Sequence, residues 1–152
     1  MAEALLLAAV FAPLLAALVA PALGRRWGAR AGYLLAAAFV PALALVAQVP
    51  AVRAGRALEA DLPWVPEIGL ELAFRADGFS LLFALLVAGI GLLILLYAAA
   101  YLGARERHGR FYSYLLFFGG AMLGLVLTDN FVALFAFWEL TSISSFLLIG
   151  FW

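Results

Sequence analysis

The sequence predicts an all-α integral membrane protein with about five transmembrane helices. Of its 152 residues, 68% are hydrophobic and only 12% are charged, whereas a soluble domain has about 25% charged residues. Apart from Glu139, the charged residues fall outside the long apolar runs, and each run is long enough to cross a ~30 Å hydrocarbon layer as a helix. We therefore expect one membrane domain covering residues 1–152.

The apolar runs predict spans at about residues 4–23, 31–49, 78–102, 111–127 and 131–152. Prolines fall inside the first two runs, and membrane helices tolerate them. A cleaved signal peptide is the alternative for the first run, because Ala20-Pro21-Ala22 is a small-residue site. A signal peptide, however, carries positive charge before its apolar run, whereas here Glu3 precedes the run and arginines follow it.

Residues 50–77 form a polar loop between the second and third spans, with three arginines and five acidic residues for a net charge of −2. Between residues 70 and 75 apolar side chains alternate with polar or small ones, which is the period of a strand. Residues 62–65 precede a Pro-to-Gly turn at 66–69 and are the expected partner strand. The pattern predicts a short β-hairpin. Its acidic residues are interpreted as a solvated surface, with cation attraction at an entrance as the alternative.

Arginine placement predicts the orientation. The loops 24–30 and 103–110 carry three arginines each, whereas the turn 128–130 carries none. Cytoplasmic loops have the excess of arginine and lysine, so both arginine loops are predicted to be cytoplasmic. The N-terminus and loop 50–77 are then outside. The chain ends at Trp152 without a polar flank, which favours an N-terminal fragment of a larger helical module.

The fourth predicted span contains Gly120 and Gly124, spaced four residues apart. This spacing lets another helix approach closely. Inside one polytopic chain it predicts internal packing rather than dimerisation. The following Thr128-Asp129-Asn130 predicts a tight turn that caps the fifth helix, with Asp129 near the positive end of the helix dipole.

Glu139 is the sole residue between Phe131 and Trp152 that can carry a charge. It lies roughly 12 Å from the start of the predicted helix. A carboxylate at that depth costs about 2.5–3.5 kcal/mol or more, so such residues are rare and usually functional. Because its protonation depends on the charges beside it, Glu139 is predicted to be a buried proton-relay acid. The alternative is a structural hydrogen bond to a neighbouring helix.

The fifth helix is predicted to have two different faces. Ser142, one turn after Glu139, is expected to support the carboxyl through a hydrogen bond. Thr141, Ser144, Ser145 and Leu148 form a small-residue ridge on roughly the opposite side, which predicts a packing seam. The face of Glu139 also carries Val132, Phe135, Ile143, Phe146 and Gly150.

Several classes of chemistry are excluded by composition. The chain has no cysteine, and its single histidine, His108, lies between two predicted spans. Neither a metal site nor a cofactor is therefore expected. The basic residues form small loop groups rather than a stripe, which excludes nucleic acid as a partner. No predicted span contains Lys, Arg or His, so a basic partner for Glu139 must come from outside these residues.

Three segments resemble one known family. They are residues 76–83 (Ala-Asp-Gly-Phe-Ser-Leu-Leu-Phe), residues 111–124, and residues 137–152, which open with Phe-Trp-Glu-Leu-Thr-Ser. They resemble the large, antiporter-like subunit of Mrp-type multisubunit cation/proton antiporters. That family is related to the antiporter-like membrane subunits of respiratory complex I, of the NADH-quinone oxidoreductase chain 5 type.

The resemblance implies a component of a Na⁺/H⁺ antiporter in the bacterial plasma membrane, with the other subunits, protons and a monovalent cation as partners. It also implies that Glu139 matches the acidic residue that pairs with a lysine on a later helix. Asp77 matches the aspartate that opens the third helix, and we interpret it as structural rather than transporting. The chain is thus expected to be part of a transporter and not an enzyme.

Two alternatives remain beside the antiporter. The first is a membrane proton-pumping subunit of a complex I-type oxidoreductase, whose chemistry would lie on other subunits. The second is a scaffold fragment that transports nothing, in which Glu139 is a packing group. The later helices and their lysines are absent from these 152 residues, so the chain by itself is expected to supply one part of a mechanism.

Overall fold

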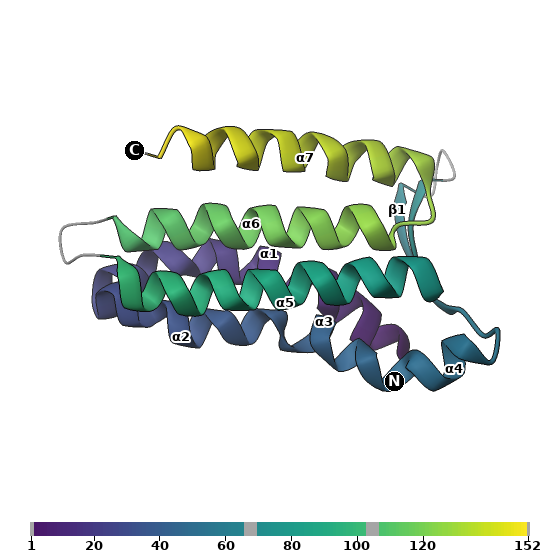
Figure 1. Ribbon diagram of the computed structural model, residues 1–152. Helices are drawn as coiled ribbons and strands as arrows, with labels where there is room; N and C mark the ends of the chain where they lie inside the picture. Colours follow the sequence, from purple (N-terminus) through teal and green to yellow (C-terminus); the bar gives the residue numbers. More distant parts are fainter. Residues whose placement is uncertain (1, 66–69, 103–106, 152) are drawn as a thin grey trace.

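The computed structural model describes residues 2–65, 70–102 and 107–151 as antiparallel helical passes with a small sheet at one end (Figure 1). Long helices form most of the bundle: α1 (Ala2–Trp27), α5 (Gly78–Tyr101), α6 (His108–Leu127) and α7 (Phe131–Ile149). Shorter segments form the second pass: η1 (Gly28–Arg30), α2 (Ala31–Leu35), η2 (Ala36–Phe39), α3 (Val40–Ala44), η3 (Leu45–Gln48) and α4 (Val49–Arg53). The predicted helical membrane fold is confirmed.

Among the described residues, four helical runs are long and apolar enough to cross a membrane: 2–53, 78–101, 108–127 and 131–149. The first of these reverses direction at Gly28, whose φ of 57° lies in the left-handed region that glycine adopts readily. It therefore contains two passes, in agreement with the predicted count of about five. With an odd number of passes, the first and last described residues lie at opposite ends of the bundle (Figure 1).

The second pass is not the regular helix that the sequence predicts at 31–49. Pro41 and Pro50 are the second residues of α3 and α4, and a 3-10 segment precedes each of these helices. Proline has no backbone N–H to donate to the preceding turn, so the helix is broken and tightened before each proline. The pass continues to Arg53 and buries Phe39, Ala42 and Leu45 against the bundle.

Other helix ends also differ from the predicted limits. Helix α1 continues to Trp27, so much of the predicted loop 24–30 is helical. Helix α6 begins at His108, three residues before the predicted start, and α7 ends at Ile149. Residues 103–106, the first half of the predicted loop 103–110, and the final Trp152 lie outside the described residues. The limits of the membrane itself along these helices stay a prediction.

The predicted hairpin is present at the end where α1 begins. Strand β1 (Leu58–Val65) pairs antiparallel with β2 (Leu70–Ala76), with Leu62 opposite Leu72. β1 starts four residues before the predicted segment, and the predicted 66–69 turn lies outside the described residues. Buried Phe74 anchors the sheet, because its ring lies 6.0 Å from both Phe11 of α1 and Phe137 of α7.

Helix α6 lies at the centre of the bundle and packs against α1, α5 and α7. Its glycines receive large side chains from neighbouring helices, so that added side-chain atoms would overlap Phe39 at Gly119, Leu14 at Gly120 and Phe137 at Gly124. The prediction that the glycine pair serves internal packing is confirmed.

The junction of α1 and α6 is tighter still, with backbone against backbone. A side-chain carbon at Gly24 would overlap the backbone of Gly109, and one at Gly109 would meet Pro21. Two hydroxyls tie α6 to the start of the chain: Tyr112 donates to the Ala29 carbonyl and Ser113 to the Ala17 carbonyl, each at 2.7 Å. The apolar side chains around these two hydroxyls cannot accept a hydrogen bond, so the backbone carbonyls satisfy the hydroxyls instead.

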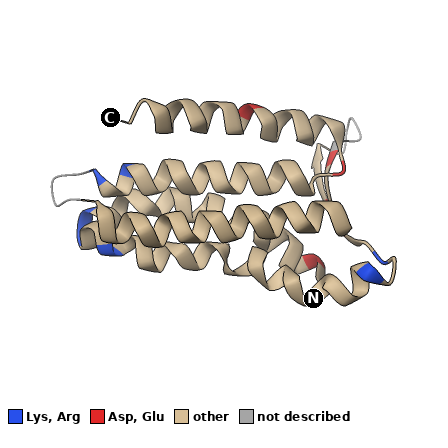
Figure 2. Ribbon diagram, viewed as in Figure 1, with Lys and Arg blue, Asp and Glu red and all other residues tan. Residues whose placement is uncertain are grey.

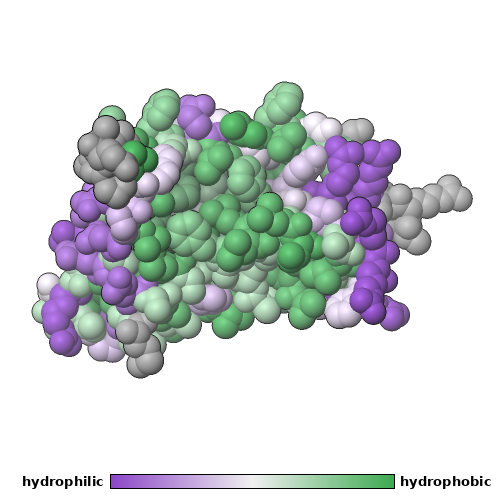
Figure 3. All heavy atoms as spheres, turned by 180° about the vertical axis from the view of Figure 1, so that it is seen from behind, coloured by the Kyte–Doolittle hydropathy of each residue, from purple (hydrophilic) through white to green (hydrophobic). Residues whose placement is uncertain are grey.

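Charged residues concentrate at the two ends of the bundle (Figure 2). One end carries Arg25, Arg26 and Arg30 beside the start of α6, while Arg53, Arg56 and the hairpin occupy the other. A wide apolar surface separates these polar ends (Figure 3). This distribution is typical of a protein whose middle lies in hydrocarbon.

Candidate functional site

Helix α7, which carries Glu139, is fixed at its first turn by Asn130. The Asn130 side-chain oxygen accepts hydrogen bonds from the backbone N–H groups of Val132 (2.8 Å) and Ala133 (3.2 Å). The cap predicted for the turn 128–130 is therefore present, and Asn130 is the residue that supplies it. Asparagine before an apolar helical run is a signal for this role in the sequence.

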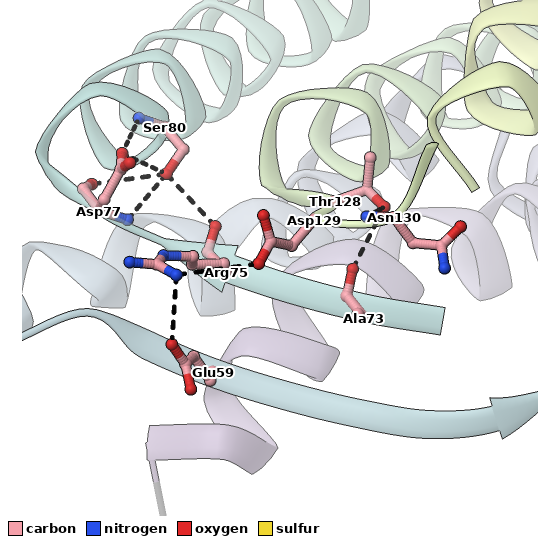
Figure 4. A network of polar contacts seen from close by, with 8 residues as sticks. All are labelled: Glu59, Ala73, Arg75, Asp77, Ser80, Thr128, Asp129 and Asn130. Carbon is pink, nitrogen blue, oxygen red and sulfur yellow. Dashed lines mark hydrogen bonds and ion pairs between the residues drawn. The ribbon is translucent and has the colours of Figure 1, made fainter. Parts of the chain in front are cut away.

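The turn before α7 is joined to strand β2 (Figure 4). Asp129 donates its backbone N–H to the Ala73 carbonyl at 2.8 Å, and the Thr128 hydroxyl donates to the same carbonyl at 3.2 Å. Arg75 lies 3.5 Å from Glu59 and 3.9 Å from Asp129. The ion pairs are exposed and contribute about 0–1 kcal/mol each, so the backbone contacts set the position of the turn.

Asp77 caps α5. Its carboxylate accepts from the N–H groups of Phe79 (3.0 Å) and Ser80 (2.9 Å), and the Ser80 hydroxyl accepts from the Asp77 N–H at 2.9 Å. The backbone N–H and the hydroxyl of Ser80 hold the pKa of Asp77 below its usual value. This reciprocal capping box accounts for the aspartate at the start of the helix in structural terms.

Helix α7 packs against α6 through one side. Ala133, Phe137 and Ser144 are buried there, and the Ser144 hydroxyl donates within its own helix to the Leu140 carbonyl at 2.7 Å. The predicted seam is therefore only partly right. Ser144 is buried within it, and the Phe137 ring, which lies against Gly124, is a further contact that the predicted seam did not include. Of the other predicted seam residues, Thr141, Ser145 and Leu148 are not fully buried.

Glu139 lies on the opposite, exposed side of α7, midway along the helix. Within the described part of the chain it has no hydrogen bond or ion pair with another side chain. Its burial, which the sequence predicted, is thus not provided by these helices. The residues that share this exposed face are those predicted: Val132, Phe135, Ser142, Ile143, Phe146 and Gly150.

Ser142 does not support the Glu139 carboxyl in this structure. Its hydroxyl donates instead to the Trp138 carbonyl at 3.2 Å, one turn back along α7. A serine inside a helix can reach the carbonyl four residues earlier in this way. The nearby Thr141 hydroxyl donates to the same carbonyl at 2.6 Å.

The site thus contains one isolated acid on a docked helix. The Asp77 carboxylate caps α5 and the Asp129 carboxylate pairs with Arg75 in the turn before α7, while Glu139 lies midway along α7. No cluster of three or more potential metal ligands occurs among residues 2–65, 70–102 and 107–151.

Comparisons with known proteins agree with this architecture. A family model described as NADH-Ubiquinone oxidoreductase (complex I), chain 5 N-terminus, matches residues 64–112. The Na(+)/H(+) antiporter subunit A1 of Staphylococcus haemolyticus (strain JCSC1435) is 44% identical over 146 residues, and that of Staphylococcus aureus is 43% identical. Each alignment covers 95% of this chain, and the chain spans 18% of the length of these curated relatives.

A solved structure gives the same result in three dimensions. A chain in the structure of the Mrp complex from Dietzia sp. DQ12-45-1b superposes with a TM-score of 0.83 at 35% sequence identity. The match covers 95% of this chain and 16% of the Dietzia chain.

The fold is that of a multi-pass membrane protein, and it matches the fold of an antiporter-like Mrp subunit. More specifically, the chain is homologous to the large, antiporter-like subunit of Mrp-type Na⁺/H⁺ antiporters, and this class is related to complex I chain 5. The resemblance predicted from the sequence is confirmed.

Proposed function

We propose that this chain forms part of the membrane module of a multisubunit monovalent cation/proton antiporter, with Glu139 as a proton-relay acid. The observation that carries the proposal is the position of Glu139. It is the sole ionisable residue from Phe131 to Trp152, and it lies on the face of α7 that the rest of the described chain leaves exposed.

The free-energy cost of a charged carboxylate at that position must be offset by a partner group. A charged carboxylate midway through a membrane helix costs about 2.5–3.5 kcal/mol or more when it faces lipid. Large apolar side chains surround it on the same face, including Phe135, Trp138 and Phe146, each more than half exposed. Such a face is suited to further helices, which would bury the carboxyl and bring a cation, such as a lysine, beside it.

The relay follows from that pairing. A cation near Glu139 favours the charged carboxylate, and withdrawal of the cation favours the protonated form. When the cation moves away, Glu139 takes up a proton, and when the cation returns, Glu139 releases it. An antiporter must couple this step to the transport of a cation. Asp77 and Ser142 have no part in this proposal, because both are engaged with backbone groups of their own helices.

A proton-pumping membrane component of an oxidoreductase is the second candidate. The complex I chain 5 model, which matches residues 64–112, supports it. The antiporter is favoured because the Staphylococcus antiporter relatives align over 95% of the chain at 43–44% identity. In either case the chain supplies a membrane step, and we propose the bacterial plasma membrane as its location.

The proposal is tested by Glu139→Gln in the complete protein, assayed for Na⁺-dependent proton exchange in everted membrane vesicles. We expect the initial rate to fall roughly tenfold or more, because glutamine cannot ionise. Glu71→Gln, an exposed hairpin carboxylate, is the matched control and should exchange normally. Normal exchange by an assembled Glu139→Gln variant would remove Glu139 from the relay.

A further inference from the structure

We propose that the arginine-rich end of the bundle is a binding site for the phosphate of an anionic phospholipid headgroup. The site lies where α1 ends and α6 begins. It consists of two adjacent pockets that share Gly24, Arg25 and His108. It is separate from Glu139 and does not depend on the transport proposal.

The pockets are large enough for a headgroup. The first has a volume of about 910 Å³ and is lined by residues 24–30 together with Leu102 and His108. The second has a volume of about 320 Å³, and Arg107 and Arg110 enter its wall. The close approach of Gly24 to Gly109 brings these two groups of residues together, so the site is a product of the helix crossing.

His108 is the observation that indicates a ligand. Its side chain is only 7% exposed, and its Nε2 atom is buried without a hydrogen-bond partner among the described residues. Most buried polar side-chain atoms are satisfied, and leaving one unpaired is costly. His108 lines both pockets, so a ligand bound there would lie beside this unpaired side chain.

The arginines around the two pockets favour an anionic ligand. Arg25, Arg26, Arg30 and Arg107 form no ion pair with a carboxylate in the described part of the chain, where the ion pairs involve Arg75 at the other end. Arg110 is held nearby by the Tyr114 hydroxyl, which it contacts at 3.1 Å. Arginine is well matched to phosphate because its guanidinium donates two parallel hydrogen bonds.

The backbone at the start of α6 adds to the positive electrostatic potential of the arginines. No described side chain caps the first turn of α6, so the positive end of this helix opens beside His108. A helix N-terminus favours an anion through its free N–H groups and its dipole. The arginines, the unpaired histidine and the helix end therefore converge on one place.

Position in the bundle favours a lipid over a free phosphate. The residues that line the pockets lie at the ends of the apolar helices α1, α5 and α6, which is the level of lipid headgroups in a multi-pass protein. Trp27, an aromatic residue suited to that interface, lines the first pocket and is 49% exposed. Apolar Leu102 contributes to the same wall. Basic pockets between membrane helices commonly receive anionic headgroups.

The test uses a photoactivatable phosphatidylglycerol with the complete protein, purified in its native assembly in a non-ionic detergent. Labelling of peptides that contain Trp27 and Leu102 is measured by mass spectrometry. Unlabelled phosphatidylglycerol, phosphatidylcholine and millimolar inorganic phosphate are added as competitors. We expect competition by phosphatidylglycerol and little by the other two.

The exposed pair Arg25→Gln and Arg30→Gln should weaken lipid binding about 20- to 30-fold, at the usual contribution of each arginine. His108→Phe, which keeps an aromatic ring but removes the ring nitrogens, should also weaken lipid binding. Arg53→Gln with Arg56→Gln, at the hairpin end, is the matched control and should leave labelling unchanged.

Three outcomes overturn the proposal. They are labelling that does not depend on Arg25 and Arg30, equal competition by phosphatidylcholine, and displacement by inorganic phosphate at the same concentration as the lipid. The last of these would identify a free anion as the ligand. Because both arginines lie at the surface of the bundle end, loss of the fold does not explain a negative result for the pair.

Discussion

Gly124 of α6 lies so close to the Phe137 ring of α7 that a side-chain carbon at Gly124 would overlap the ring. The contact docks the helix that carries Glu139. We expect Gly124→Ala to lower the free energy of unfolding by about 1–3 kcal/mol through overpacking. Denaturant unfolding in detergent, followed by circular dichroism, measures the change.

Gly89 of α5 is the matched control, because nothing lies within 4 Å of the position its side chain would occupy. Gly89→Ala should be neutral or should stabilise by up to about 1 kcal/mol, through helix propensity. Equal effects of the two substitutions would show that Gly124 has no special packing role.

Phe74 is expected to matter more for the docking of α7 than the ion pairs of Arg75. The Phe74 side chain is 1% exposed and contacts aromatic rings on α1 and α7. Phe74→Ala should destabilise by about 3–5 kcal/mol. Arg75→Gln should cost less than about 1 kcal/mol, because its partners are solvated. A larger loss for Arg75→Gln in the same unfolding assay would reverse this ranking.

Replacement of Asp77 should test the capping box of α5. Asp77→Ala should cost about 1 kcal/mol, while Asp77→Asn keeps an acceptor and should cost less at neutral pH. Amide hydrogen exchange at the first turn of α5 reports the difference, with faster exchange expected for the alanine variant. Unchanged exchange in both variants would contradict the capping role.

The pKa of Asp77 also predicts a pH dependence. Hydrogen bonds from Ser80 lower the pKa in the folded protein, so the unfolded chain binds the proton more readily. The stabilising contribution is complete above the ordinary pKa of an aspartate and is lost as the pH falls through the lower folded value. Asp77→Asn should remove this part of the acid sensitivity, and an identical pH profile in the variant would exclude it.

Orientation in the membrane is tested by cysteine labelling, since the natural chain contains no cysteine. We propose that the hairpin end faces outward and that the arginine-rich end is cytoplasmic. Glu71→Cys should react with a membrane-impermeant maleimide in intact cells, whereas Arg107→Cys should react only after permeabilisation. The reverse pattern would invert the topology.

Much of the fold could be predicted because the membrane restricts the choices. A long apolar run in lipid must satisfy its own backbone, so length and hydropathy are sufficient to predict most passes. The strand alternation near Leu72 likewise predicted the hairpin. The prediction was less accurate at residues 31–53, where Pro41 and Pro50 break a pass that composition alone describes as one helix.

The candidate site, like the fold, could be predicted from the sequence only in part. The sequence by itself determined that Glu139 is an isolated charge within an apolar helix and that Ser142 shares its face, because both facts follow from composition and helical period. Only the tertiary structure decided which helix α7 docks on, that Ser142 bonds the Trp138 carbonyl, and that His108 is buried at the junction of α1 and α6. These three facts depend on where side chains from distant segments meet, as Phe137 meets Gly124. The pattern of residues along one helix does not identify the segments that pack against it.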